Sequence, residues 1–379
     1  MSHPPQFSPT RLKIARQLAG LKQIELAELV GITPPALSQY EHGLHAPSPP
    51  VLQKLAFSLG FPRDFFLGGQ TAAPSPAFFR SLRSTPQRQR DRAAAYAWLV
   101  ARVVEAVELH VKLPKCDLRL ESAIPAAPTR ADIEQAAALV RTQLGVPRGP
   151  VANVVRLLEA HGAAVATFAD GDSRLSAFSQ WHGHRPIVVF CLGNEDKARR
   201  RYDAAHELGH LALHSDPEPG NHVLEQQADE FASAFLMPAE DISPFLPQGR
   251  VQWAELEKLK RVWGVSLQAL VVRSHRLGRI SDRSYQQAFR HISREGWRRN
   301  EPVELGPPEE PQLLARAFTL LGKKGLKPEE VLRALALPES LVHLAGVSGS
   351  AGEAGASVVP LKPRPPAAPA APERRLSTN

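Results

Sequence analysis

Apolar residues recur three and four positions apart along most of the chain, which is the spacing of one face of a helix. Between residues 163 and 192 the period changes: AAVATFA, RLSAFSQ and RPIVVFCL are short alternating or β-branched runs separated by Gly, Asp and His. Helical spacing covers residues 9–67, the part of residues 77–113 that follows Pro86, a stretch that begins at residue 131, and residues 151–161, 203–297 and 309–346. The pattern predicts a mainly α protein with a small antiparallel β-sheet, an α+β fold.

Domain borders are expected where small residues and proline gather, as in FFLGGQTAAPSP. We predict an N-terminal helical bundle over residues 1–69, a helical linker over 70–128, a domain with the strands over 129–302, a small C-terminal helical segment over 303–346 and a disordered Pro/Ala-rich tail over 347–379. The C-terminal segment either packs on the domain with the strands or forms a second, regulator-like helical unit. We favour packing.

The composition limits the class of protein. The chain has 379 residues and 46 Lys and Arg against 38 Asp and Glu, which gives a formal charge of +8 and suits a polyanionic partner. With Cys116 and Cys191 as the only cysteines, a disulfide framework and an all-cysteine metal site are excluded. Neither a signal-like N-terminus nor a run of about 18 apolar residues occurs. We therefore expect a soluble cytoplasmic protein that binds no membrane.

Residues 201–214, RYDAAHELGHLALH, place two histidines four apart with a glutamate after the first. On a helix His206 and His210 lie on one face and can bind one Zn²⁺, while Glu207 stands beside them to activate a bound water. We expect Asp203 to be the N-cap of this helix.

A catalytic zinc site usually needs a third protein ligand and one open position. The next helical stretch, EQQADEFASAFLMP, supplies Glu225 as that ligand, and Asp229, one turn later, can accept the free N–H of a ligand histidine. The rival third ligands are His214, His222 and Asp216. For His214 we favour a helix-end histidine that meets the C-terminal dipole.

These two motifs, with LSAFSQWHGHRPIVVF upstream and WGVSLQALVVRSHRLGRISDRSYQQAFRHISREGWRRNEP downstream, resemble the ImmA/IrrE family of bacterial zinc metallopeptidases over residues 130–302. The resemblance implies a zincin-like HExxH domain in which His206, His210 and Glu225 bind Zn²⁺ and Glu207 is the general base. The family is associated with cutting partner transcriptional repressors under stress or inducing signals. It often has a second acid where this chain has Gln227.

The mechanism implied is metal-assisted peptide hydrolysis, with Glu207 taking the proton of the water and passing it to the leaving amine. The sheet edge near residues 177–179 or 187–190 can bind an extended peptide by strand addition. The oxyanion donor is left open among Tyr202, His182, His184 and His222.

The N-terminal stretch carries a second motif. QIELAELV is followed by Gly31 and a helix from Thr33 through PPALSQYE, and Leu26, Ala27, Val30, Ile32 and Leu37 are the apolar contacts expected between these two helices of a helix-turn-helix. The pattern resembles the XRE, or Cro-like, DNA-binding domain. A helical bundle used only for dimerisation or partner binding is the alternative.

The DNA-contact residues follow from the start of the second helix. Pro34 and Pro35 cannot donate a hydrogen bond to a base, so Thr33, Ser38 and Gln39 remain for bases or phosphates, with Gln23 placed for phosphate.

Together the motifs predict a DNA-binding transcriptional regulator that carries a zinc endopeptidase and cleaves itself or a partner regulator. Its expected partners are double-stranded DNA and a protein substrate that is itself a transcriptional regulator, and homodimer formation is left open. In the alternative, the zinc domain is sensory or structural. Glu207 favours catalysis, because a structural zinc site needs no general base and closes its fourth position.

Overall fold

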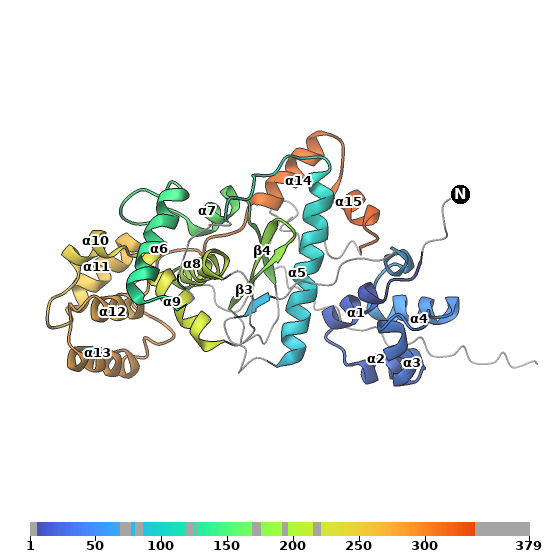
Figure 1. Cartoon of the computed structure of the whole chain (residues 1–379), viewed down its shortest axis with the longest axis horizontal. Coiled ribbons are helices and arrows are strands. Elements are labelled where there is room, and N and C mark those ends of the chain that lie inside the picture. The colour runs from blue at the N-terminus through green and yellow to red at the C-terminus, as the bar shows by residue number, and fades with distance from the viewer. Residues whose placement is uncertain are drawn as a thin grey trace, which may run out of the picture. The chain divides into compact units, whose positions relative to one another are not determined.

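The computed structural model describes residues 6–68, 77–79, 86–118, 125, 127–168, 176–191, 196–214 and 221–337. The tail expected to be disordered, 347–379, lies outside these residues, and so does the border expected near residue 69. Two compact units can be distinguished, one formed mainly by residues 1–73 and the other mainly by residues 74–335 (Figure 1). No helix within the described ranges is both long and apolar enough to cross a membrane.

The first unit is a small bundle of helices. Its apolar interior includes Leu12, Leu26, Leu37 and Leu55, which are buried on four different helices. The elements are α1 (Pro9–Leu18), α2 (Gln23–Val30), α3 (Pro34–Glu41), α4 (Pro49–Leu59) and the 3₁₀ helix η1 (Arg63–Leu67).

The turn between α2 and α3 depends on Gly31. This residue caps α2 with φ of 74°, in the left-handed region that side chains with a Cβ rarely adopt. Thr33 then caps α3, its Oγ1 accepting from the backbone N–H of Ala36 at 3.4 Å, and Pro34 and Pro35 occupy the first turn, where a missing N–H costs little. The predicted helix-turn-helix is present.

The second unit contains a four-stranded sheet in the order β1-β3-β4-β2. Its strands are β1 (Ala77–Phe79), β2 (Ala164–Phe168), β3 (Ala177–His182) and β4 (Arg185–Cys191). The α+β class is confirmed, but the prediction of an antiparallel sheet is wrong in part, because β2 and β4 are parallel. Strands β3 and β4 form a hairpin, and β4 lies between β3 and β2. The alternation of apolar residues predicts the strands but not their order in the sheet. No strand was expected at β1, whose three residues are too few to show a period.

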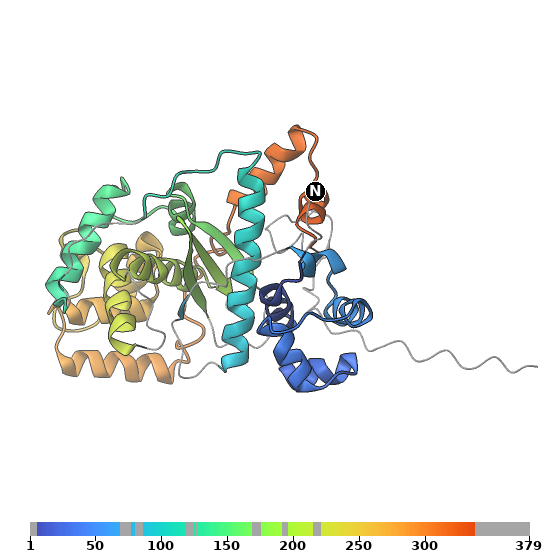
Figure 2. The ribbon, with the colours of Figure 1, turned by 45° about the vertical axis from the view of Figure 1, so that its right-hand side comes forward.

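Helix α5 (Gln87–Glu108) lies in the range predicted as a helical linker, yet it packs against the sheet. The Tyr96 hydroxyl donates to the carbonyl oxygen of Thr167 at 2.6 Å, and the Tyr96 ring stacks on Phe168 with centroids 4.6 Å apart. Burial raises the pKa of Tyr96 above its ordinary value. The helix is thus an integral part of the second unit (Figure 2).

Two long helices, α8 (Lys197–Leu213) and α9 (His222–Leu236), pack against each other beside the sheet. Gly209 allows their close approach, because a Cβ at this position would lie 3.0 Å from Phe231 Cδ1 and 3.3 Å from the Ala228 Cα on α9. The surrounding helices are α6 (Arg130–Gln143), α7 (Val154–Ala160), α10 (Ala239–Ile242), η2 (Ser243–Phe245), α11 (Trp253–Trp263), α12 (Leu267–Arg276) and α13 (Asp282–Arg294).

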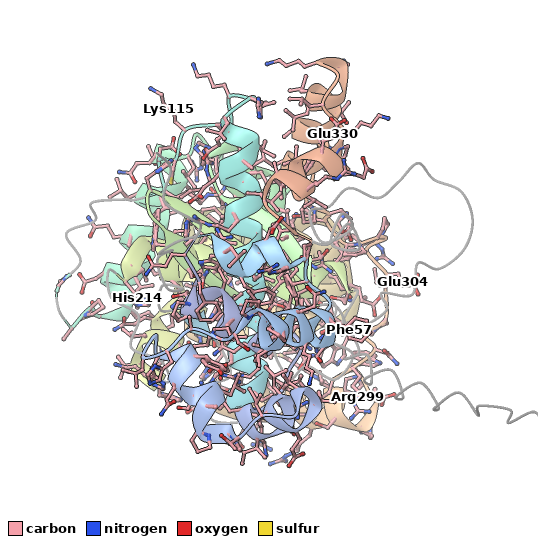
Figure 3. All side chains as sticks on the ribbon, turned by 90° about the vertical axis from the view of Figure 1, so that its right-hand side faces the viewer. Phe57, Lys115, His214, Arg299, Glu304 and Glu330 are labelled. Atoms are coloured by element: carbon pink, nitrogen blue, oxygen red, sulfur yellow. The ribbon has the colours of Figure 1, made fainter. Side chains whose placement is uncertain are left out.

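The C-terminal segment ends the described chain with α14 (Leu313–Lys323) and α15 (Pro328–Ala334), both in contact with α5. Before α14, Glu309 is almost fully buried; its carboxylate pairs with Arg201 of α8 and accepts from the backbone N–H of Val154 at 2.7 Å. The segment therefore packs on the second unit, as favoured. In the first unit, Phe57 of α4 is a large apolar side chain that is 44% exposed; it is labelled in Figure 3.

Candidate functional site

The helix that carries the HExxH motif begins earlier than expected. Asp196 is the N-cap, its Oδ1 accepting from the backbone N–H of Arg199 at 2.8 Å, and α8 runs to Leu213. The expectation that Asp203 caps the helix was wrong: Asp203 lies inside α8, where it is buried and 3.9 Å from Arg199. The helix therefore starts before the motif, so His206 lies well inside α8, while His210 is in its last turn.

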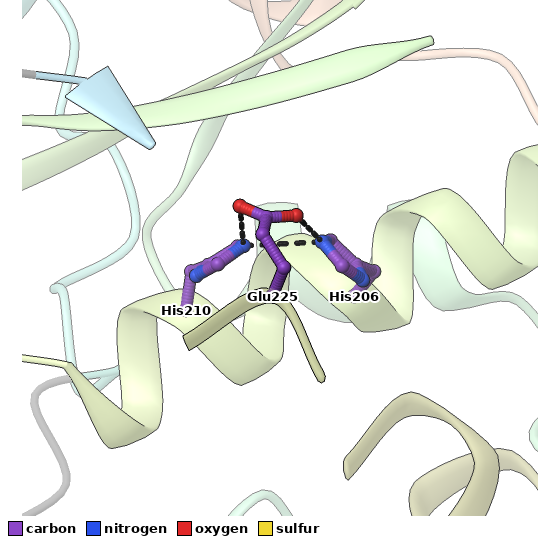
Figure 4. Close-up of side chains that lie close together, drawn as sticks. All are labelled: His206, His210 and Glu225. Atoms are coloured by element: carbon purple, nitrogen blue, oxygen red, sulfur yellow. Dashed lines mark hydrogen bonds and ion pairs between the residues drawn. The ribbon is translucent and has the colours of Figure 1, made fainter. Parts of the chain in front are cut away.

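His206, His210 and Glu225 converge on one point (Figure 4). The two histidine Nε2 atoms are 3.1 Å apart, and each lies 3.4 Å from a different carboxylate oxygen of Glu225. Both imidazoles are at most 1% exposed. Burial lowers the pKa of His210 to about 4, so its ring is neutral and offers a lone pair.

The geometry fits a tetrahedral metal ion. Nitrogen and oxygen ligands bound to Zn²⁺ at about 2.0–2.1 Å lie roughly 3.3 Å from one another, close to the separations that these three side chains show. Burial alone would raise the pKa of Glu225, but its contacts with His206 and His210 lower the pKa to about 2, so the carboxylate is charged. Two neutral imidazoles and one carboxylate are a donor set that zinc accepts.

Glu207 is fully buried beside this cluster. Its Oε2 accepts from the Ser179 hydroxyl of β3 at 2.6 Å, while its Oε1 is buried without a hydrogen-bond partner among the described residues. Burial is the main cause that raises the pKa of Glu207 to about 7, against the opposing effects of His206 and Ser179. A carboxyl with such a pKa can both take up and release a proton near neutral pH. The role of Ser179 was missed, since a lone serine in a strand carries no sequence signal.

Each histidine of the cluster has a hydrogen-bond partner at its Nδ1 atom. His206 Nδ1 lies 3.0 Å from Asp229 Oδ1, the arrangement expected for a carboxylate that orients a metal ligand. His210 Nδ1 lies 3.0 Å from His214 Nδ1, and His214 Nε2 lies 3.0 Å from Gln227 Oε1. When His210 Nε2 is the acceptor toward the cluster, its Nδ1–H donates to His214, whose Nε2–H donates to Gln227.

His214 is therefore more than a helix-end histidine. It caps α8 and is only 7% exposed, with its ring nitrogens directed at His210 and Gln227 rather than into the cluster. Of the other rival ligands, His222 is an exposed residue at the start of α9 and takes no part in the cluster, and Asp216 lies outside the described residues.

The candidates for an oxyanion donor are dispersed. The Tyr202 hydroxyl donates to the backbone carbonyl of Asp229 at 2.9 Å, which is a structural contact between α8 and α9. His182, at the end of β3, lies 2.9 Å from Glu105, and His184 is exposed in the following turn. None of these contacts involves the cluster.

The predicted DNA-contact residues lie on or near α3 in the first unit. Thr33 and Gln39 are exposed and Ser38 is half-buried. Gln23, at the start of α2, donates through its side-chain amide to Glu41 at 2.8 Å, and the same carboxylate pairs with Arg16. The side-chain amide of Gln23 is thus engaged within the bundle, whereas Gln39 faces solvent.

Comparison with known proteins gives two matches to family models and no match to a curated protein. Residues 12–66 match the helix-turn-helix model. Residues 158–275, which include the whole metal cluster and Glu207, match the model of the IrrE N-terminal-like domain, a peptidase family. The chain thus carries an XRE-type helix-turn-helix followed by an IrrE/ImmA-like region, in the order that the sequence predicted.

Proposed function

We propose that this protein is a DNA-binding transcriptional regulator whose second unit is a zinc-dependent endopeptidase acting in the cytoplasm. The observation that carries the proposal is the cluster of His206, His210 and Glu225 beside the buried carboxyl of Glu207. The match to a peptidase family over the same residues supports it. We propose that residues 1–69 bind DNA and that residues 129–302 carry the peptidase motifs, with β1 and α5 completing the same unit.

In this site His206, His210 and Glu225 would hold Zn²⁺. The chemistry that the ion would supply is polarisation of the scissile carbonyl and a lower pKa of the attacking water. Glu207 takes the proton of the attacking water on its Oε1, because its Oε2 already accepts from Ser179. The same carboxyl then passes the proton to the amine that leaves. Asp229 keeps the His206 ring oriented, and the pair of His214 and Gln227 does so for His210.

The DNA-binding part of the proposal rests on the helix-turn-helix. Its second helix, α3, presents Thr33 and Gln39 to solvent, as a helix that enters the major groove must. The paired carboxylate of Glu41 and the buried core hold that helix in place. Double-stranded DNA is therefore the proposed partner of the first unit.

The first test is the metal content of the protein purified without added zinc, measured by mass spectrometry for wild type, His206→Ala and Glu225→Ala. We expect one zinc per chain in wild type and its loss in both variants. Zinc retained after Glu225→Ala would reassign the third ligand, and its absence from wild type would contradict the proposal.

The second test separates catalysis from a structural or sensory zinc. Glu207→Gln should keep the zinc, because Glu207 is not a ligand, and should lose hydrolysis of β-casein, an unfolded protein chosen as a probe. Casein cleavage that persists in a zinc-loaded Glu207→Gln variant would remove Glu207 from the mechanism.

A further inference from the structure

Strand β1 lies at the open edge of the sheet, next to the candidate active site. It pairs antiparallel with β3, with Ala77 opposite Gln180, Phe78 opposite Ser179 and Phe79 opposite Phe178. The other side of β3 is occupied by β4, so β1 takes the one edge at which β3 can accept another strand. This segment precedes α5 and follows the helix-turn-helix unit in the chain.

The same edge is the one that reaches the metal cluster. Ser179 of β3 donates to the Glu207 carboxylate, which places the middle of β1 in register with the residue that contacts the proposed general base. The other edge strand, β2, is separated from β3 by β4. Figure 4 shows β1, the pale blue arrow, beside β3 on the side of the cluster toward which the Glu225 carboxylate points.

Extended peptides commonly bind by adding a strand to an exposed sheet edge, where main-chain hydrogen bonds provide affinity. A protein substrate that pairs with the β3 edge would be brought next to Glu207, because Ser179 of β3 contacts that carboxyl. In this chain that edge already holds three residues of the chain itself, paired antiparallel with β3.

We propose that the segment at β1 is a substrate of the peptidase in cis, cleaved after Ala77, Phe78 or Phe79. Water adds to the carbonyl carbon of one peptide bond and the C–N bond breaks. Glu207 carries the proton to the nitrogen, and the products are a new carboxylate and a new amine. The cut separates the DNA-binding unit from the peptidase unit. This inference rests on the proposed function and names its substrate.

The test uses the full chain loaded with Zn²⁺ and followed by intact-mass spectrometry at several protein concentrations, with β-casein as a second substrate. We expect one cut, with the N-terminal fragment ending at Ala77, Phe78 or Phe79. Its rate should not depend on chain concentration, and Glu207→Gln should abolish it.

A pair of variants tests the role of strand pairing. In an antiparallel pair, the N–H groups of neighbouring residues alternate between the partner strand and the outer side. Prolines at both Ala77 and Phe78 therefore remove a pairing donor whichever phase applies. The double variant Ala77→Pro/Phe78→Pro should slow the cut at least about tenfold. The matched variant Ala77→Val/Phe78→Leu keeps both N–H groups and should be cut at close to the wild-type rate.

The outcomes separate this inference from the proposed function. If casein is hydrolysed in a Glu207-dependent way while the chain stays intact, the inference is overturned and the peptidase stands. Casein hydrolysis that rises in the double proline variant, without any self-cleavage, would make β1 an inhibitory strand instead of a substrate. A cut elsewhere, or a rate that grows with protein concentration, also overturns cleavage in cis at β1. If the zinc-loaded protein cuts neither substrate, both proposals fail.

Discussion

The metal cluster and the exposed face of α3 differ in how their side chains are supported. His206, Glu207 and His210 are at most 1% exposed and each has a side-chain hydrogen-bond partner, whereas Gln39 projects into solvent from the short helix α3. Burying charged or ligating groups is costly unless they are paired, so the metal cluster needs a network of partners that the exposed face of α3 does not need. A substitution among the buried partners of the cluster should therefore affect folding and metal together, and one of an exposed α3 residue should affect DNA binding alone.

The largest effect is expected from Glu309, far from the cluster in sequence. Glu309→Ala leaves Arg201 charged and buried and removes the acceptor for the N–H groups at the start of α7, so it should lower the unfolding free energy of the second unit by about 3–5 kcal/mol. Denaturant unfolding followed by tryptophan fluorescence measures this unit alone, because Trp98, Trp181, Trp253, Trp263 and Trp297 are all in it. Glu309→Gln is the milder control. A loss under about 1 kcal/mol would show that this buried pair is not needed.

The next effect concerns the partner behind His206. Asp229→Asn weakens the acceptor for His206 Nδ1–H and should lower zinc affinity roughly 10–100-fold, as measured by competition with a chelator. The helix-turn-helix should bind DNA as before. An unchanged zinc affinity would mean that the packing of α8 against α9 is enough to orient His206.

On α3 the expected effect is smaller and confined to DNA. Gln39→Ala should weaken binding to a duplex that the wild type selects from a random pool by about 1 kcal/mol, the size of one lost base contact. Zinc content and tryptophan unfolding should stay the same. If Gln39→Ala binds that duplex as tightly as the wild type, base readout lies elsewhere on α3.

The smallest effect tests the partner behind His210. Gln227→Leu removes the acceptor for His214, which contacts His210 only indirectly, so zinc affinity should fall by about 0.5–1 kcal/mol. Chelator competition at the same pH as for Asp229→Asn allows direct comparison. A loss equal to that of Asp229→Asn would show that the two histidines depend equally on their partners.

The sequence by itself determined the features that depend on local spacing. The helix-turn-helix follows from Gly31, the prolines at the start of α3 and the apolar period, and the HExxH pair follows from the 3.6-residue turn of a helix. Glu225 and Asp229, also four apart, were found for the same reason.

Only the tertiary structure decided the contacts between distant segments. The parallel pairing of β2 with β4, the packing of α5 on the sheet and the position of β1 beside β3 depend on which strands meet, which a local period does not encode. Ser179 against Glu207 and Glu309 against Arg201 join residues 28 and 108 positions apart in the chain. Side chains so far apart in the chain meet because burial of the shared apolar core brings their elements together. Their contacts therefore cannot be predicted from local sequence.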